Sequence, residues 1–141
     1  ERSSYPIFFV EAIQQFQKNL VLLGNSAHTI HPNAAQGFNL GLRDAAGLAE
    51  CIHSALEKKL SVDNINILNA YLELRNSDQK RVTGFINGIA TSFYNHSSVF
   101  TPITNTIMLL FDCIPEFKYL FLKRAMGLAG YQPRLVRGLD L

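Results

Sequence analysis

Residues 20–46 read LVLLGNSAHTIHPNAAQGFNLGLRDAA, and this stretch decides the fold. Its apolar run 20–23 ends at Gly24, a polar loop continues past Pro32, and a helical pattern opens at Gln36. A continuous apolar run is typical of a strand covered on both faces. A helix that opens after such a strand and loop presents free N–H groups and a partial positive charge. The stretch therefore predicts a docking place for a phosphate, an electron-rich carbonyl or a flavin-type ring.

These residues resemble the second flavin-binding motif of the FAD-dependent aromatic-ring monooxygenases of the para-hydroxybenzoate hydroxylase type. Within that group, residues 28–32 and 36–41 are most similar to the ubiquinone-biosynthesis hydroxylases. The blocks RAMGLAG at 124–130 and PRLVRG at 133–138 are similar to the C-terminal ending of the same hydroxylases. The resemblance implies an α/β, FAD-binding, Rossmann-like fold. This chain would then be a mostly α-helical part of it with one or two strands.

The resemblance implies roles for positions before the helix. Gly24 makes the turn after the strand. Asn25 stands where the family has an aspartate that accepts a hydrogen bond from a ribityl hydroxyl of FAD. An amide oxygen accepts the same bond without charge assistance, so the bond is weaker by a factor of about two. Pro32 is implied to lie near the reactive face of the flavin ring, and no residue is assigned a catalytic role.

The resemblance also implies that main-chain N–H groups at the helix opening point at the N1–C2=O edge of the flavin. Reduced flavin carries negative charge at that edge, and preorganised N–H dipoles stabilise such charge. The positions concerned are Gln36, Gly37, Phe38 and Asn39. Gly37 lets the ring approach the main chain. Ala35 stands where the subfamily commonly has glycine, so a positive φ there would cost about 1 kcal/mol or more.

The histidines in the loop leave three interpretations open. His28 as a structural residue of the flavin loop is the favoured one. A metal pair formed by His28 and His31 would need a further ligand, and His53 and His96 lie on other predicted elements. Proton transfer by either loop histidine is the third. Asp44 is interpreted as a structural anchor near the loop and not as a base, and no metal is expected.

The composition is that of an ordinary globular chain. The net charge is +2, with 17% charged and 48% hydrophobic residues. This charge balance gives no electrostatic case for a nucleic-acid partner, which would require a dense basic face. Cys51 and Cys113 are expected to be buried free thiols. Residues 82–111 contain no Asp, Glu, Lys or Arg, yet their polar side chains and Pro102 argue against a membrane span.

Periodicity predicts the elements around the motif. Strands are expected over 5–10 and 20–23, with a loop or turn over 14–19. A helix is expected from Gly37 to about Lys58. Its apolar face is predicted from spacings of three and four and comprises Leu42, Ala45, Ala49, Ile52 and Leu56.

A second long helix is expected after a cap supplied by Ser61 and Asp63. Its stripe contains Ile65, Leu68, Leu72, Val82, Ile86, Ile89 and Phe93. Arg75 and Gln79 interrupt this stripe. They are placed at the rim of the packed face, in preference to a contact with a buried polar group or a partner domain.

The C-terminal part is expected to be helical. A segment begins at Pro102, and a last helix runs from Glu116 to about Leu128, with Pro115 in its first turn and glycines ending it. This part is apolar and basic. Packing on the flavin domain or on another subunit is favoured over contact with an anionic membrane surface.

The resembled family begins with a Gly-x-Gly-x-x-Gly unit, and this chain has none. We therefore expect the C-terminal third of a larger enzyme. Residues 1–19 would end the substrate-domain strand and its connecting loop, 20–60 would form the second half of the FAD-binding domain, and 61–141 the C-terminal helical region.

The function implied by the resemblance is hydroxylation of a polyprenyl-phenol ubiquinone precursor, with FAD as cofactor, NAD(P)H as reductant and O₂ as co-substrate. The fragment alone is expected to be inactive. The expected setting is cytoplasmic or peripheral at the inner membrane, in an oligomer and beside other ubiquinone-biosynthesis proteins. Asn25, Ala35 and the missing dinucleotide half leave an alternative: a non-catalytic helical interaction module that has lost flavin binding.

Overall fold

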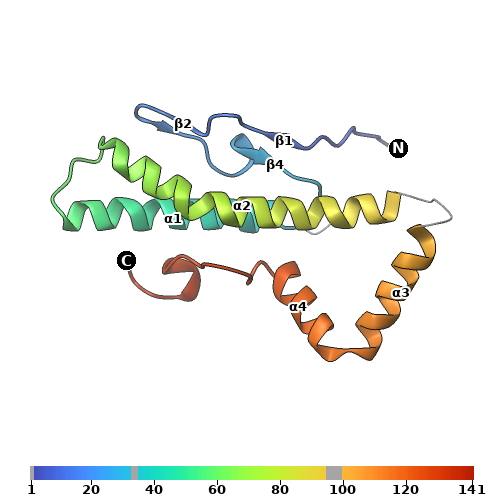
Figure 1. Ribbon diagram of the computed structural model, residues 1–141. Helices are drawn as coiled ribbons and strands as arrows, with labels where there is room; N and C mark the ends of the chain where they lie inside the picture. Colours follow the sequence, from blue (N-terminus) through green and yellow to red (C-terminus); the bar gives the residue numbers. More distant parts are fainter. Residues whose placement is uncertain (1, 33–34, 95–99) are drawn as a thin grey trace.

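The computed structural model describes residues 2–32, 35–94 and 100–141. Two long antiparallel helices form its body, with short strands on one side and the C-terminal segment on the other (Figure 1). In the described residues, the α-helices are α1 (Gly37–Glu57), α2 (Ile65–Tyr94), α3 (Phe100–Cys113) and α4 (Pro115–Ala125). The mostly helical expectation for this part of an α/β fold is therefore confirmed.

The strands are short and pair in two antiparallel ladders. In the described residues they are β1 (Val10–Glu11) with β4 (His28–Thr29), and β2 (Phe16–Gln17) with β3 (Leu20–Val21). The described residues also include the 3₁₀ turns η1 (Gly24–Ser26) and η3 (Leu135–Arg137).

The predicted strands were too long, and β2 and β4 were missed. Residues 5–9 form no ladder with any described segment, so the expected strand over 5–10 is reduced to its last residue and Glu11. The run 20–23 is a strand only at 20–21, where it closes a hairpin with β2 and leaves Leu20 exposed. An apolar run becomes a doubly covered strand only where neighbouring strands and layers exist, and β2 is the one described strand that pairs with β3.

The buried face of α1 differs from the prediction. Its length is as expected, but Leu42 and Leu56 are more than half exposed, whereas Leu40, Arg43 and Asp44 are buried. The buried face of α1 is rotated by about one residue from the predicted face. Arg43 and Asp44 pair with charged side chains of α2, and burial of paired charge is tolerated. The apolar cluster beside them consists of Ile30, Leu40, Val82 and Ile86, with Phe85 packed against it.

The described part of the α2 stripe is largely as predicted, with corrections at its start and centre. The side chain of Phe93, its last predicted member, lies outside the described residues. Ile65 is exposed, and the cap comes from Asn64, whose Oδ1 accepts a hydrogen bond from Asn66 N at 3.0 Å, instead of Ser61 and Asp63. The rim interpretation of Arg75 and Gln79 was wrong, since both are buried against α1.

The helices α3 and α4 form a hairpin that extends away from the body (Figure 1). The Phe121 ring joins it to the body, with ring centroids 5.3 Å from Phe85 and 5.0 Å from Phe111. Pro115 occupies the first turn of α4, as predicted, but the helix ends at Ala125, before Gly127 with its φ of 70°. Many apolar side chains of both helices are exposed, including Ile107, Met108, Leu109, Phe117 and Leu120.

The two thiols are free, but neither is fully buried. Cys51 is half-buried, and burial raises its pKa, whereas Cys113 is exposed, so the expected burial is wrong there. Within the described ranges, no helix combines the length and the apolar character that crossing a membrane requires.

Candidate functional site

Two glycines bring the turn after β3 against α1. Gly24 adopts a φ of 56°, in the region that favours glycine. A Cβ placed on Gly41 would lie only 3.2 Å from the Gly24 Cα, so the turn and the helix touch main chain to main chain. This contact places Asn25 beside the helix start, with its Oδ1 4.0 Å from the position of a Cβ on Gly37.

The start of α1 is uncapped within the described part of the chain. The Gln36 side chain makes no capping bond, and the first intrahelical bond runs from Leu40 N to Gln36 O at 2.8 Å. Among the residues that the structure describes, no partner accepts from the N–H groups of Gly37, Phe38 or Asn39. As far as the described residues show, three N–H groups and the positive end of a long helix dipole are therefore available to an electron-rich ligand.

The predicted site residues lie around this opening. Gly24, Asn25 and the start of α1 are brought together, and Phe38 and Asn39 have exposed side chains. Pro32 is exposed in the loop before the helix. The side chain of Gln36 is instead buried and donates from Nε2 to the Ala125 carbonyl, so only its main chain remains for a ligand.

Ala35 has a φ of 50°, which is the strained case set out from the sequence. A left-handed conformation costs a residue with a Cβ roughly 1–2 kcal/mol relative to glycine. Its N–H donates to the Pro32 carbonyl at 3.0 Å, so the turn that carries this strain leads directly into α1. Alanine in place of glycine at position 35 therefore introduces backbone strain immediately before the start of α1.

A buried carboxylate holds the loop from behind. Asp44 is fully buried, and its Oδ2 lies 2.6 Å from His28 Nε2 and 3.4 Å from Gly24 N. Since an ionised carboxylate only accepts, His28 carries its proton on Nε2. His28 is therefore a structural residue that ties β4 to α1, and Asp44 is the anchor that the sequence indicated.

The other carboxylate oxygen of Asp44 is bonded to α2. Arg75 Nε donates to Oδ1 at 2.9 Å and Gln79 Nε2 donates at 3.1 Å. Burial alone would raise the pKa of Asp44, but the His28 hydrogen bond, the Arg75 charge and the Gln79 bond outweigh it and hold the pKa below its usual value. Asp44 therefore stays ionised and keeps the loop, α1 and α2 together.

A second ion pair extends the network toward the C-terminus. Arg43 Nε donates to Asp78 Oδ2 at 3.0 Å, and Arg43 Nη1 donates to the Gly127 carbonyl at 3.1 Å. Arg75 Nη1 lies 2.7 Å from the same Asp78 oxygen. The two atoms form a close ion pair, but their angles do not meet those of a hydrogen bond. Two arginines and two aspartates thus balance one another in the interior.

The remaining histidines form no metal site in the described parts of the chain. No group of three or more His, Cys, Asp or Glu side chains is suitably placed there. His31 is half-buried in the loop, and His53 on α1 lies 3.6 Å from Glu57. His96 lies outside the described residues.

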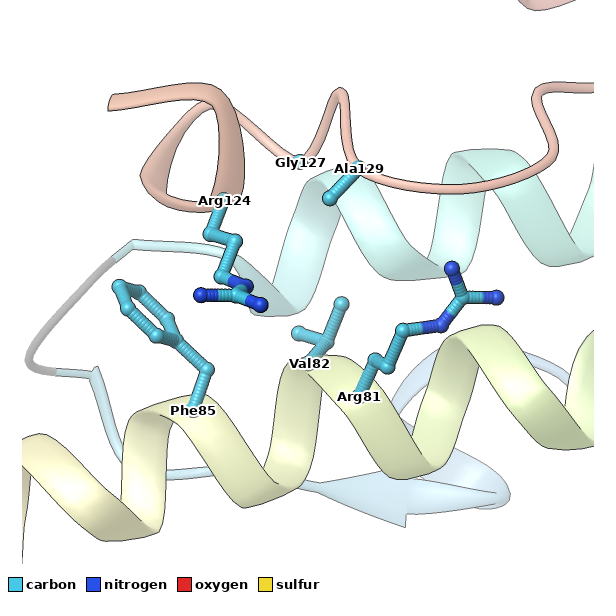
Figure 2. A pocket seen from close by; sticks show the side chains of 6 residues that line it. All are labelled: Arg81, Val82, Phe85, Arg124, Gly127 and Ala129. Atoms are coloured by element: carbon cyan, nitrogen blue, oxygen red, sulfur yellow. The ribbon is translucent and has the colours of Figure 1, made fainter. Parts of the chain in front are cut away.

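A cavity of about 310 Å³ lies between α2, the end of α4 and the chain that follows α4 (Figure 2). Arg81 and Arg124 extend into it, over a wall made by Val82 and Phe85. None of the predicted flavin residues lines it. The cavity marks where the C-terminal segment crosses α2.

A family profile described as "FAD binding domain" matches residues 10–83, which is more than half of the chain. The chain belongs to this FAD binding domain family. The FAD binding domain match contains the Gly24 turn, all of α1 and the part of α2 that carries Arg75, Asp78 and Gln79. The expected FAD cofactor and the flavin-monooxygenase fold class are confirmed.

Relatives with curated names agree with the FAD binding domain assignment. A ubiquinone hydroxylase of Rhodospirillum rubrum is 32% identical over 99% of this chain and 33% of its own length. The 3-demethoxyubiquinol 3-hydroxylase of Escherichia coli is 29% identical over 89% of this chain and 32% of its length. An uncharacterized Synechocystis protein is 29% identical over 99% of this chain and 34% of its length. The chain thus spans about a third of the length of these relatives, and no solved structure matches it significantly.

Sequence reasoning missed the partners behind the FAD binding domain loop. Arg43 and Asp78 were not singled out, although each adjoins a polar residue that was. The available signal was a pair of opposite charges within each predicted helix: Arg43 with Asp44, and Arg75 with Asp78. Opposite charges one to three positions apart in two predicted helices indicate a buried network more than a rim.

Proposed function

We propose that the complete protein is an FAD-dependent monooxygenase that hydroxylates the aromatic ring of a polyprenyl phenol. The observation that carries this proposal is the uncapped start of α1, set against the Gly24–Asn25 turn inside the FAD binding domain match. The names of the R. rubrum and E. coli relatives support the choice of a ubiquinone precursor as substrate.

The residues of this chain fit one edge of the cofactor. The N–H groups of Gly37, Phe38 and Asn39 would donate to the flavin carbonyl edge, and the Asn25 amide would accept from a ribityl hydroxyl. Bound FAD supplies the passage of two electrons from NAD(P)H to O₂. Preorganised donors stabilise the negative charge that this transfer places on the ring edge, because they need no reorientation as the charge develops.

The proposed reaction balances. An aromatic C–H, O₂, NAD(P)H and one proton give the phenolic C–OH, water and NAD(P)⁺. One oxygen atom enters the ring and the other leaves as water. NAD(P)H supplies the two electrons needed to reduce this second oxygen atom to water. This chain contributes the flavin-side loop and helix, while the ADP-binding half and most of the substrate pocket belong to the length that its relatives have in addition.

The test uses the complete protein. Flavin released by heat is identified chromatographically, and NAD(P)H oxidation is followed with and without an isoprenylated phenol under ¹⁸O₂. We expect bound FAD, substrate-stimulated oxidation and one labelled oxygen in the product. Absence of flavin, or oxidation of NAD(P)H with no hydroxylated phenol, would contradict the proposal.

We further propose that the exposed apolar sides of α3 and α4 are covered by the rest of the protein or by another subunit in the cytoplasm. The support is the number of large apolar side chains they expose, since such a surface is typical of a contact region. Liposome flotation of the complete protein at low and high salt distinguishes this from membrane contact. Flotation at either salt would favour the membrane.

A further inference from the structure

Three polar side chains on one side of α1 hold the segment 125–134, which we call the C-terminal latch. They are Gln36, Arg43 and Glu50, each seven residues from the next. Seven residues are nearly two helical turns, so these positions form one stripe along the helix. The latch thus follows α1 from its uncapped start through most of its length (Figure 1).

Each of the three side chains contacts the latch directly. Gln36 donates to the Ala125 carbonyl and Arg43 donates to the Gly127 carbonyl at 3.1 Å. Glu50 accepts from the Tyr131 hydroxyl at 2.6 Å and from the main-chain N–H of residue 134 at 3.0 Å. A latch residue, Gln132, adds a second donor to the Gly127 carbonyl at 2.8 Å.

Arg43 connects the latch to the turn before the flavin-side helix. It is buried, and its Nε is paired with Asp78, which in turn lies 2.7 Å from Arg75. Arg75 donates to Asp44, the residue that accepts from His28 and from the Gly24 N–H. Because all four charges of this chain of contacts are buried, displacement of the Arg43 guanidinium leaves Arg75 as the one cation shared between Asp78 and Asp44.

Gly127 shows how closely the latch sits. Its φ is 70°, and a Cβ there would lie 2.2 Å from Arg43 Nη1 and 3.0 Å from Gln36 Oε1. No side chain fits at this position while Arg43 keeps its place. The latch is therefore matched to the positions of the two α1 side chains that precede and follow the free N–H groups.

We propose that the C-terminal latch positions the start of α1 and the Gly24 turn for FAD, with Arg43 as the positioning residue. This inference rests on the proposed function. If the latch orders the flavin-side loop, FAD must in turn stabilise the latch, because coupling between two sites is reciprocal.

The test compares Gly127→Ala with Gly138→Ala in the complete protein. Gly138 has a φ of 72°, and a Cβ there would meet nothing within 4 Å. Both substitutions thus carry the same backbone strain, and only the first displaces Arg43. We expect Gly127→Ala to weaken FAD binding roughly fivefold or more, with an altered visible circular dichroism of the bound flavin, and Gly138→Ala to leave both unchanged.

Amide hydrogen exchange supplies the second readout. In the wild type, added FAD should slow exchange in residues 125–134, and in the flavin-free protein Gly127→Ala should speed exchange in residues 24–32. Equal FAD affinity and equal amide exchange in the two variants would overturn the proposed positioning role of the latch. A wild type that holds no FAD would contradict the proposed function, and the flavin-free exchange comparison would still decide the latch. Gln132→Leu, which removes one donor and adds no strain, replaces Gly127→Ala if that variant does not fold.

Discussion

Asp44→Asn is the sharpest perturbation of the buried network. The substitution keeps the size of the side chain and removes its charge at a position with no exposed surface. Asp44 accepts from His28, Arg75 and Gln79 and from the Gly24 N–H. An amide has one acceptor oxygen where a carboxylate has two. At least one of the groups that donate to Asp44 would therefore face an NH₂ group in the variant.

The loss of stability follows from the partner that is left behind. Arg75 is fully buried, and its remaining counter-charge, Asp78, is shared with Arg43. Removal of one partner of a buried ion pair costs about 3–5 kcal/mol, because the other charge stays out of water without compensation. Since whole domains are stable by only about 5–15 kcal/mol, the variant should unfold at a markedly lower urea concentration.

The assay is urea unfolding of the complete protein at several pH values, with Asp63→Asn as the control. Asp63 is exposed, so the same chemical change there should stay within about 0.5 kcal/mol. The pKa of Asp44 is lowered from 3.8 in the folded state. Its contribution is therefore complete above pH 3.8 and lost as the pH falls through the lower folded value. The difference between wild type and Asp44→Asn should be constant near neutral pH and shrink in acid.

A neutral-pH difference no larger than that of Asp63→Asn would refute this reasoning. So would a difference that grows on acidification, because a group with a lowered folded pKa loses its contribution in that direction. Either result would mean that the charge of Asp44 does not hold the loop against the two helices.

Three smaller predictions concern single residues of the motif and of α1. Ala35→Gly should raise the free energy of unfolding by about 0.5–1 kcal/mol, since relief of about 1–2 kcal/mol of strain exceeds the entropy gained by the unfolded chain, and any loss in thermal melting would contradict it. Asn25→Asp should bind FAD at least as tightly as wild type in a fluorescence titration, because a carboxylate accepts the ribityl bond with charge assistance, and a large loss would show that the position does not face the ribityl chain. Gly47→Ala should lower stability by about 1 kcal/mol because its Cβ would lie 2.9 Å from Arg75 Cδ, whereas Gly84→Ala on the open side of α2 should raise it by up to about 1 kcal/mol. Equal urea midpoints for these last two variants would contradict the close packing of α1 on α2.

The short-range pattern of residues was sufficient for the turn, the loop and the helices around them. The end of the apolar run at Gly24, the loop with Pro32 and the helix opening at Gly37 were predicted at nearly their observed positions. Turns, caps and helical periodicity depend on residues a few positions apart, so the sequence states them directly. The strain at Ala35 was set out as a condition from the resemblance, because the subfamily commonly has glycine there, and the φ of 50° meets that condition.

Which face of α1 is buried was decided by tertiary structure. The apolar residues Leu42 and Leu56 predicted one face, and the structure buries Arg43 and Asp44 instead. Burial of a charge depends on counter-charges from α2, more than thirty residues away, and hydrophobic periodicity carries no information about them. The sequence by itself determined a flavin-type loop that ends in an open helix start. Only the folded chain decided that the loop is held from behind by buried ion pairs and by a C-terminal segment, because contacts between distant segments set the free energy of burying charge.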